Sequence, residues 1–230
     1  MLLAVGATGW SVHESTPALA LMAELRTAKG QRRQVRLSDG SQLELNSDSA
    51  VDIHFDGQQR QLRLYRGEIM VQTASDPARP FEVQTAEGRV RALGTRFSVR
   101  SDDGQSRVSV LQHAVEIRPV DNPLLMLRLE AGQSVSFDQR QIGSAHSAAP
   151  GTGAWTQGML TVIEWRLADF VSELRRYRPG MLRCAEGIAD LRLSGAFRID
   201  DTDTILENLS ASLPVKVRYL TRYWVSIEAV

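Results

Sequence analysis

The feature that most constrains the fold of this chain is a long series of short segments in which apolar and polar residues alternate. The series runs from Gln34 to about Phe137, and its segments are separated by acidic residue–glycine pairs: Asp39-Gly40, Asp56-Gly57, Glu87-Gly88 and Asp103-Gly104. Alternation with a period of two places every second side chain on one face of a strand, and such pairs favour turns. The pattern predicts an all-β domain of many short strands.

An internal repeat organises this region. The segment VRLSDGSQLEL at residues 35–45 resembles VQTAEGRVRAL at residues 83–93, and residues 51–71 resemble residues 97–117. A third, partial copy starts at Leu127. Because one copy cannot bury a sheet face alone, the copies are expected to stack as a sandwich or a short solenoid. Chance alternation is the alternative explanation of the similarity.

The alternation stops after Ile142, where Gly, Ser, Ala, Thr and Pro dominate up to Gly158. This composition is typical of a flexible connector, so residues 143–158 are expected to link two domains. Trp155 is the large apolar residue of the segment. We expect it to pack on a neighbouring domain, and ligand binding is the alternative.

The last segment, residues 159–230, predicts a small α+β domain with the element order β-α-β, β-α-β-β. Apolar residues fall on one stripe of an amphipathic helix at Leu167, Phe170, Val171 and Leu174, and Pro179-Gly180 ends that helix. Asp200 or Asp201 is expected to cap a second helix. Closing strands are predicted near Leu213–Tyr219 and Tyr223–Ile227.

Composition excludes several classes of function. The 230 residues suffice for two domains, and 27 basic residues balance 27 acidic ones without a basic run, so nucleic acid is not an expected partner. The single cysteine, Cys184, cannot form an intrachain disulfide and is expected to be an inert thiol. The four histidines are too dispersed to form a metal site: His13, His54, His113 and His146. We therefore expect no enzyme activity, metal or cofactor.

The first ten residues are apolar, but a membrane span needs about twenty residues. They are either a disordered tail or the outer end of a truncated transmembrane helix, where Trp10 takes the position of an interfacial aromatic. On the second interpretation residues 1–25 are the end of that helix and a juxtamembrane linker. Ala18 to Arg26 favours a helix by propensity.

Three separated segments resemble the periplasmic region of FecR-type sigma regulators. They are LSDGSQLELNSDSA (37–50), GEIMVQTASDPARPFEVQTAEGRVRALGTRFSVR (67–100) and RLSGAFRIDDTDTILENLSASLPVKVRYLTRYW (192–224). The resemblance starts near Arg26 and runs to the end of the chain. It makes residues 26–142 a FecR-like all-β domain, and residues 159–230 resemble the secretin and TonB receptor short N-terminal domain. It also implies that Ala18–Arg26 pairs as a strand.

The resemblance implies an anti-sigma regulator that takes part in cell-surface signalling. In that family a cytoplasmic segment, which this sequence lacks, holds an extracytoplasmic-function (ECF) sigma factor, and one helix crosses the inner membrane of a Gram-negative bacterium. The periplasmic part receives its signal from the N-terminal signalling domain of a TonB-dependent outer-membrane receptor loaded with a ferric siderophore. Iron-uptake transcription is the expected output.

The partner is expected to dock on the C-terminal domain. The candidate contacts are Leu174, Tyr177, Leu191, Leu193, Phe197, Tyr223 and Trp224. Trp and Tyr supply binding hot spots, and the strand around Tyr223-Trp224 is a candidate edge for an added strand. Each residue could instead belong to the core. A carbohydrate-binding or adhesive β module is the competing function, and it would need exposed aromatic residues on one sheet.

Overall fold

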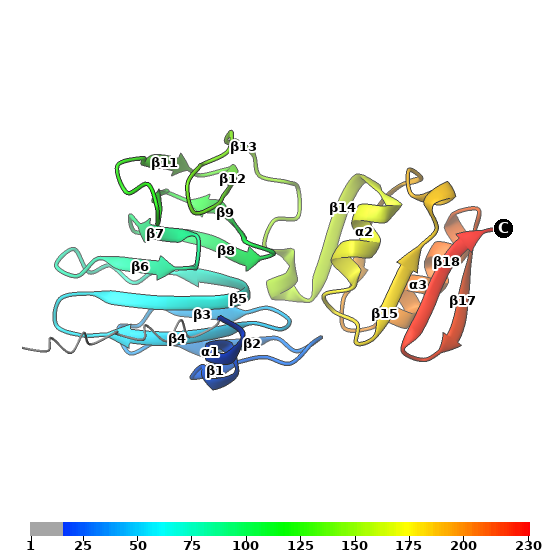
Figure 1. Cartoon of the computed structure of the whole chain (residues 1–230), viewed down its shortest axis with the longest axis horizontal. Coiled ribbons are helices and arrows are strands. Elements are labelled where there is room, and N and C mark those ends of the chain that lie inside the picture. The colour runs from blue at the N-terminus through cyan, green and yellow to red at the C-terminus, as the bar shows by residue number, and fades with distance from the viewer. Residues whose placement is uncertain (1–15) are drawn as a thin grey trace, which may run out of the picture.

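The computed structural model describes residues 16–230, which form a β-rich N-terminal domain and a smaller C-terminal domain (Figure 1). The apolar segment at residues 1–10, with Trp10, lies outside the described residues. Among the residues described, no helix is long and apolar enough to cross a membrane.

Thirteen strands of the described chain form one curled sheet in the N-terminal domain. A short helix, α1 (Thr16–Met22), precedes them. The strands are β1 (Leu25–Arg26), β2 (Arg33–Arg36), β3 (Gln42–Leu45), β4 (Ala50–Phe55), β5 (Arg60–Gln72), β6 (Phe81–Gln84), β7 (Gly88–Ala92), β8 (Arg96–Asp102), β9 (Gln105–Gln112), β10 (Ala114–Pro119), β11 (Leu127–Glu130), β12 (Gln133–Phe137) and β13 (His146–Ser147). The all-β expectation for this half is confirmed.

Strand β5 joins the two layers of the sheet. Its first half pairs with β4 and β6, and its second half pairs with β3 and β8. The change of partners occurs at Gly67, whose φ is +89°. A Cβ atom there would lie 2.6 Å from Ser49 Cα, so the position requires glycine for both its backbone conformation and its close contact.

The internal repeat corresponds to repeated strand pairs. Strands β2 and β3 form an antiparallel hairpin in which Val35 faces Leu43, and β6 and β7 form the matching hairpin in which Val83 faces Val90. The antiparallel pair β4–β5 is matched by β8–β9. Strand β5 is continuous from Arg60 to Gln72, because Gly67 carries the chain between layers without a turn.

Apolar side chains from both layers fill one core between them. The inward positions of each strand are buried, as at Leu43, Leu62, Phe81, Phe97 and Leu129. Full burial of one such side chain contributes about 1.5–3 kcal/mol. This alternation of buried and exposed positions is the origin of the period-two sequence pattern.

Both expectations for Ala18–Arg26 are partly correct. Helix α1 covers the first part of this segment, and β1 covers its end, where Leu25 pairs with Val51 of β4. Ala20 and Ala23 are buried against Tyr65, so the segment packs on the β-rich domain.

The connector is more ordered than its composition suggests. His146 and Ser147 pair with β12, and a 3₁₀ helix, η1 (Ala154–Gln157), follows. Trp155 is buried in a small apolar cluster that includes Met70 and Ile199, one from each domain. The expected flexible connector is therefore packed, and the expectation that Trp155 packs on a neighbouring domain is confirmed.

The C-terminal domain contains two small sheets and two α-helices. Its elements are β14 (Met159–Arg166), α2 (Leu167–Leu174), β15 (Met181–Cys184), η2 (Glu186–Ile188), β16 (Arg192–Arg198), α3 (Thr202–Ser212), β17 (Val215–Thr221) and β18 (Trp224–Ala229). Strands β14 and β16 form one antiparallel pair. In the other sheet, β18 lies between β15 and β17.

The two helices lie between the two sheets. Helix α2 contacts β14 and β15, whereas α3 contacts β16 and β17, so each helix touches one strand of each sheet. The predicted stripe of α2 is buried in this core, and Asp201 caps α3 by accepting a hydrogen bond from Thr204 N at 3.0 Å. Neither helix therefore covers the outer face of the β15–β18–β17 sheet, whereas the connector lies against β14.

Candidate functional site

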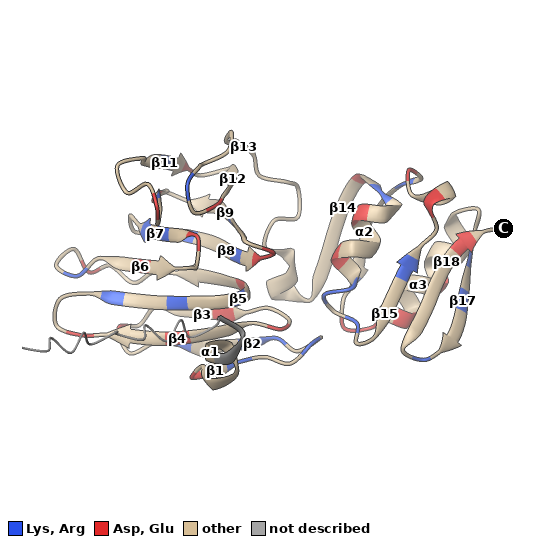
Figure 2. Cartoon of the chain, in the orientation of Figure 1, with Lys and Arg blue, Asp and Glu red and all other residues tan. Residues whose placement is uncertain are grey.

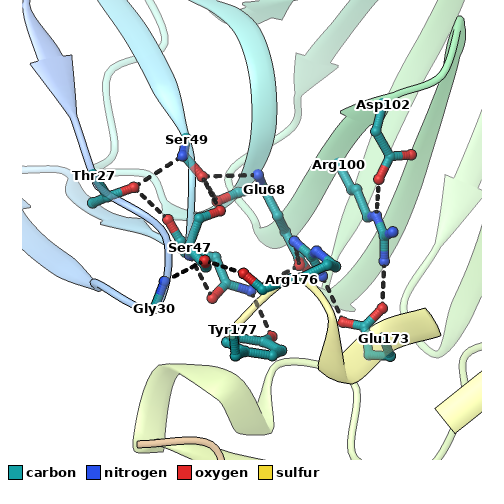
Figure 3. Close-up of polar contacts among 11 residues, drawn as sticks. Thr27, Gly30, Ser47, Ser49, Glu68, Arg100, Asp102, Glu173, Arg176 and Tyr177 are labelled. Carbon is teal, nitrogen blue, oxygen red and sulfur yellow. Dashed lines mark hydrogen bonds and ion pairs between the residues drawn. The ribbon is translucent and has the colours of Figure 1, made fainter. Parts of the chain in front are cut away.

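The two domains meet in a cluster of ionised side chains (Figure 3). Glu68 lies on β5 and Arg100 on β8, while Glu173 and Arg176 come from the end of α2 and the turn that follows. Arg100 Nη1 donates to Glu173 Oε2 at 2.7 Å, and Arg176 Nη1 donates to Glu173 Oε1 at 2.6 Å. Arg176 Nη2 lies 2.8 Å from Glu68 Oε2, an ion pair without hydrogen-bond geometry. Arg100 also pairs within its own domain, because its Nε donates to Asp102 Oδ2 at 2.6 Å. Three carboxylates and two guanidinium groups thus form one network across the domain boundary.

In this cluster each ionised group stabilises the charged form of its partner, as the directions of the pKa shifts show. Burial by itself raises the pKa of the Glu173 carboxyl group, but Arg176 and Arg100 outweigh burial and hold that pKa below its ordinary value of 4.5. Burial also disfavours the charged form of Arg176, yet Glu68 and Glu173 raise the pKa of its guanidinium group. Near neutral pH Glu173 and its two partners, Arg100 and Arg176, are therefore charged.

Neutral hydrogen bonds extend the contact on one side of the cluster. Asn46 Nδ2 donates to Tyr177 Oη at 3.0 Å and to Glu68 Oε2 at 2.9 Å, while Ser47 Oγ donates to the carbonyl of Arg176. Burial is the main cause that raises the pKa of the Tyr177 phenol, so this hydroxyl remains protonated. The turn after α2 is held through both side-chain and main-chain atoms.

Gly30 allows this close approach. Its N–H donates to Ser47 Oγ at 2.8 Å, and its φ is +80°. A Cβ atom on Gly30 would lie 2.8 Å from the carbonyl oxygen of Tyr177. A side chain at this position would push the C-terminal domain away from the loop.

Apolar packing completes the interface. Its buried side chains come from β5, the connector and the C-terminal domain: Met70, Trp155, Tyr177 and Ile199. Arg32 of the N-terminal domain joins the connector to the C-terminal domain at the edge of this apolar cluster. Its guanidinium group donates to the Trp155 carbonyl at 2.8 Å and to both carboxylate oxygens of Asp200 at 3.0 and 3.1 Å. The N-terminal domain, the connector and the C-terminal domain therefore all contact one another at this cluster.

A cavity of about 160 Å³ lies beside these contacts, with walls from both domains that include Arg100, Trp155, Thr161, Glu173 and Tyr177. In the described part of the chain, no three His, Cys, Asp or Glu residues gather in a way that could hold a metal ion. The arrangement joins the two domains through opposite charges.

Most of the predicted partner contacts are not on the surface. Leu174 and Leu193 are buried in the C-terminal core, and Leu191 and Phe197 are half-buried against it. Tyr177 is buried at the domain interface. Burial leaves Leu174, Leu193 and Tyr177 little surface to offer a partner, because apolar periodicity marks the core of a small domain more often than its binding surface. Leu191 and Phe197 stay predictions.

Two predicted contacts are exposed. Tyr223 and Trp224 keep 49% and 43% of their surface accessible at the start of β18. The interpretation of this segment as a sheet edge is wrong, because β18 pairs with β15 on one side and β17 on the other. Trp224 therefore offers its ring on a sheet face, whereas the edges of this sheet are β15 and β17.

Sequence reasoning missed the interdomain cluster. Glu68 and Arg176 are far apart in the chain, and each follows a pattern that an ordinary solvated charge would also follow. The available signal was a glycine, Gly67, directly before Glu68 within an alternating segment. Only the relative placement of the two domains brings the charges together.

Residues 23–116 match the FecR protein family. The match covers most of the β-rich domain just described, and the FecR family is a class of regulatory rather than catalytic proteins. The resemblance to FecR-type anti-sigma regulators drawn from the sequence is confirmed.

Two crystal structures extend the likeness to almost the whole chain. Both are of a "putative anti-sigma factor" from Parabacteroides distasonis, at 1.65 and 2.50 Å resolution. Each is 21% identical to this chain and covers 90% of it and 98% of the solved chain, with TM-scores of 0.73 and 0.72. At this identity the likeness establishes the fold. No curated protein matches the sequence.

Proposed function

We propose that this chain is the periplasmic sensor region of a single-pass inner-membrane anti-sigma regulator. In this proposal its C-terminal domain is of the secretin and TonB receptor short N-terminal type. That domain binds the signalling domain of a TonB-dependent outer-membrane receptor. The signal then passes to an ECF sigma factor, which a cytoplasmic segment of the regulator holds, and controls iron-uptake transcription.

The observation that carries this proposal is the combination of a FecR domain with a second domain that presents exposed aromatic side chains. Strand β18, which begins at Trp224, lies in the part of the molecule remote from the N-terminal domain (Figure 1). Large aromatic side chains are the residue types that dominate protein–protein binding energy. A protein partner could therefore reach them while the FecR domain remains in contact with α2.

The interdomain cluster supports a route for the signal. Glu173 and Arg176 belong to the C-terminal domain but are paired with Arg100 and Glu68 of the FecR domain. A partner can shift the equilibrium between docked and separated domains only if it binds one state more tightly. In our proposal the receptor favours one of these two states, and altered packing or exposure of the connector to proteolysis passes the message inward.

Calorimetric titration of this chain with receptor signalling domains, one at a time, tests the proposal. We expect one domain to bind, and we expect Trp224→Glu to weaken that binding at least about tenfold, as expected for a hot-spot residue. Leu124→Glu is the matched control, because Leu124 is 94% exposed on the other domain. A folded chain that binds no receptor domain would rule out the proposed partner.

A further inference from the structure

The outer face of the β15–β18–β17 sheet has an unusual arrangement of side chains. Side chains alternate between the faces of a strand, and Leu182, Val215, Val225 and Ile227 point inward to the core. The outer face therefore carries Met181, Arg183, Lys216, Arg218, Trp224, Ser226 and Glu228. Neither helix covers this face, since both helices lie between the two sheets.

Positive charge dominates this outer face. The strand register places Ser226 of the central strand between Arg183 on β15 and Arg218 on β17. Lys216 faces Glu228 across the same strands, and Glu228 is the one acidic residue of the face. Figure 2 shows the basic positions on β15 and β17 at the end of the molecule.

The cations of this face have no acidic partner within the described chain. Ion pairs join many arginines elsewhere in the protein, such as Arg60 to Asp39 and Arg166 to Asp190. Among the described residues, no carboxylate lies within ion-pair distance of Arg183, Lys216, Arg218 or the neighbouring Arg222. These cations are therefore available to pair with carboxylates of another molecule.

An apolar patch lies next to these cations, at the end of the face where β15 and β18 begin. Trp224 pairs in register with Met181, and 43% of the surface of each remains exposed. The Arg183 guanidinium lies 5.8 Å from the Trp224 ring centroid, so the aromatic ring and the charge form one surface. A protein–protein interface usually combines an apolar part with a neighbouring polar and charged part, as this face does.

We propose that this sheet face binds an acidic protein surface. The partner's carboxylates pair with Arg183, Lys216 and Arg218, and an apolar side chain of the partner packs on Trp224 and Met181. The inference rests on the proposed function, because it specifies the chemistry by which a receptor signalling domain would be recognised. It predicts that the cognate domain carries clustered Asp and Glu residues on its docking surface.

Two other anionic partners fit this face less well. A nucleic acid is bound through many phosphate contacts, typically about six to ten, and this face offers fewer cations. A lipid surface would favour apolar residues at a protruding tip with cations behind them. Trp224 and Met181 do lie at one end of the face, but two further rows of the sheet carry its cations, Arg183 and Arg218 beside Ser226 and then Lys216 beside Glu228, so most of the face is a flat polar surface. The arrangement therefore favours a protein partner.

The test reverses the charge of Lys216 and Arg218 together in the full chain. The variant K216E/R218E is compared with R33E/R36E, which makes the same change of charge at exposed positions of β2 in the other domain. The probes are receptor signalling domains and poly-L-glutamate, at low and high salt. We expect K216E/R218E to weaken binding of both probes at least about tenfold and to remove most of the salt dependence, while R33E/R36E changes neither.

Several outcomes separate this inference from the proposed function. If a receptor domain and poly-L-glutamate bind K216E/R218E as tightly as the unmodified chain, the inference is wrong and the proposed function stands. If no receptor domain binds but poly-L-glutamate binding depends on these residues, the acidic recognition stands and the receptor is the wrong partner. Binding of phosphatidylserine vesicles that is lost in K216E/R218E, without an effect on protein probes, would overturn the inference. K216Q/R218Q repeats the test if the reversed charges unfold the domain.

Discussion

Arg176 Nη2 lies 2.8 Å from Glu68 Oε2, and this ion pair joins the turn after α2 to strand β5 of the other domain. Both side chains are largely buried, with 14% and 13% of their surfaces exposed. Such a pair is not a strong source of stability by itself, but loss of one partner leaves a buried charge without compensation. The pair therefore makes the docked arrangement of the domains sensitive to single substitutions.

We expect Arg176→Ala to weaken the docking of the two domains. The change leaves Glu68 and Glu173 without their shared cation, and breaking a buried pair in this way costs about 3–5 kcal/mol. Differential scanning calorimetry should show that unfolding separates into two transitions, and limited proteolysis should cut within residues 143–158. Arg128→Ala is the control, since its exposed pair with Glu130 is worth about 0–1 kcal/mol. Unchanged unfolding of Arg176→Ala would show that the pair does not hold the domains.

Acidification should loosen the same contact through Glu173. Its pKa in the folded protein lies below the ordinary 4.5, so its contribution to stability is fully present above about pH 4.5 and is lost as pH falls through the folded pKa. Thermal unfolding as a function of pH should therefore show a loss of stability below about pH 4.5. The variant Glu173→Gln should be less stable at neutral pH and should lose less on acidification. Parallel pH profiles for the two proteins would contradict this assignment.

Trp224 and Phe170 should differ sharply in their effect on stability. Phe170 is fully buried, so Phe170→Ala is expected to lower the free energy of unfolding by about 3–5 kcal/mol. Trp224→Ala changes an exposed side chain and should alter stability by no more than about 0.5 kcal/mol, while weakening partner binding. Chemical denaturation of both variants checks this expectation. A large loss on Trp224→Ala would place that ring in the core.

Gly67→Ala should disturb the crossing of β5 between the two layers. An added Cβ atom would lie 2.8 Å from the Asp48 carbonyl oxygen, and the φ of +89° disfavours any residue with a side chain. We expect a marked fall in the urea midpoint of the FecR domain. Gly57→Ala is the comparison, because nothing lies within 4 Å of its added Cβ atom. Equal midpoints for the two variants would show that the crossing tolerates a side chain.

Local patterns in the sequence determined most of the secondary structure. Alternation of apolar residues marks strands directly, as at Val51 and Ile53 on β4, because burial on one face of a strand imposes a period of two. The helical stripe from Leu167 to Leu174 and the cap at Asp201 were readable for the same local reason. The internal repeat and the family resemblance together predicted that the β-rich domain is FecR-like.

The tertiary structure decided which of these residues reach a partner. An apolar residue such as Leu174 has the same pattern whether its stripe faces the core or a partner, and only packing shows that it is buried. The pairing of Arg176 with Glu68 and the bare sheet face around Trp224 depend on contacts between segments far apart in the chain. Periodicity reports which face of an element is apolar, whereas the neighbour of that face is set by the relative placement of whole elements.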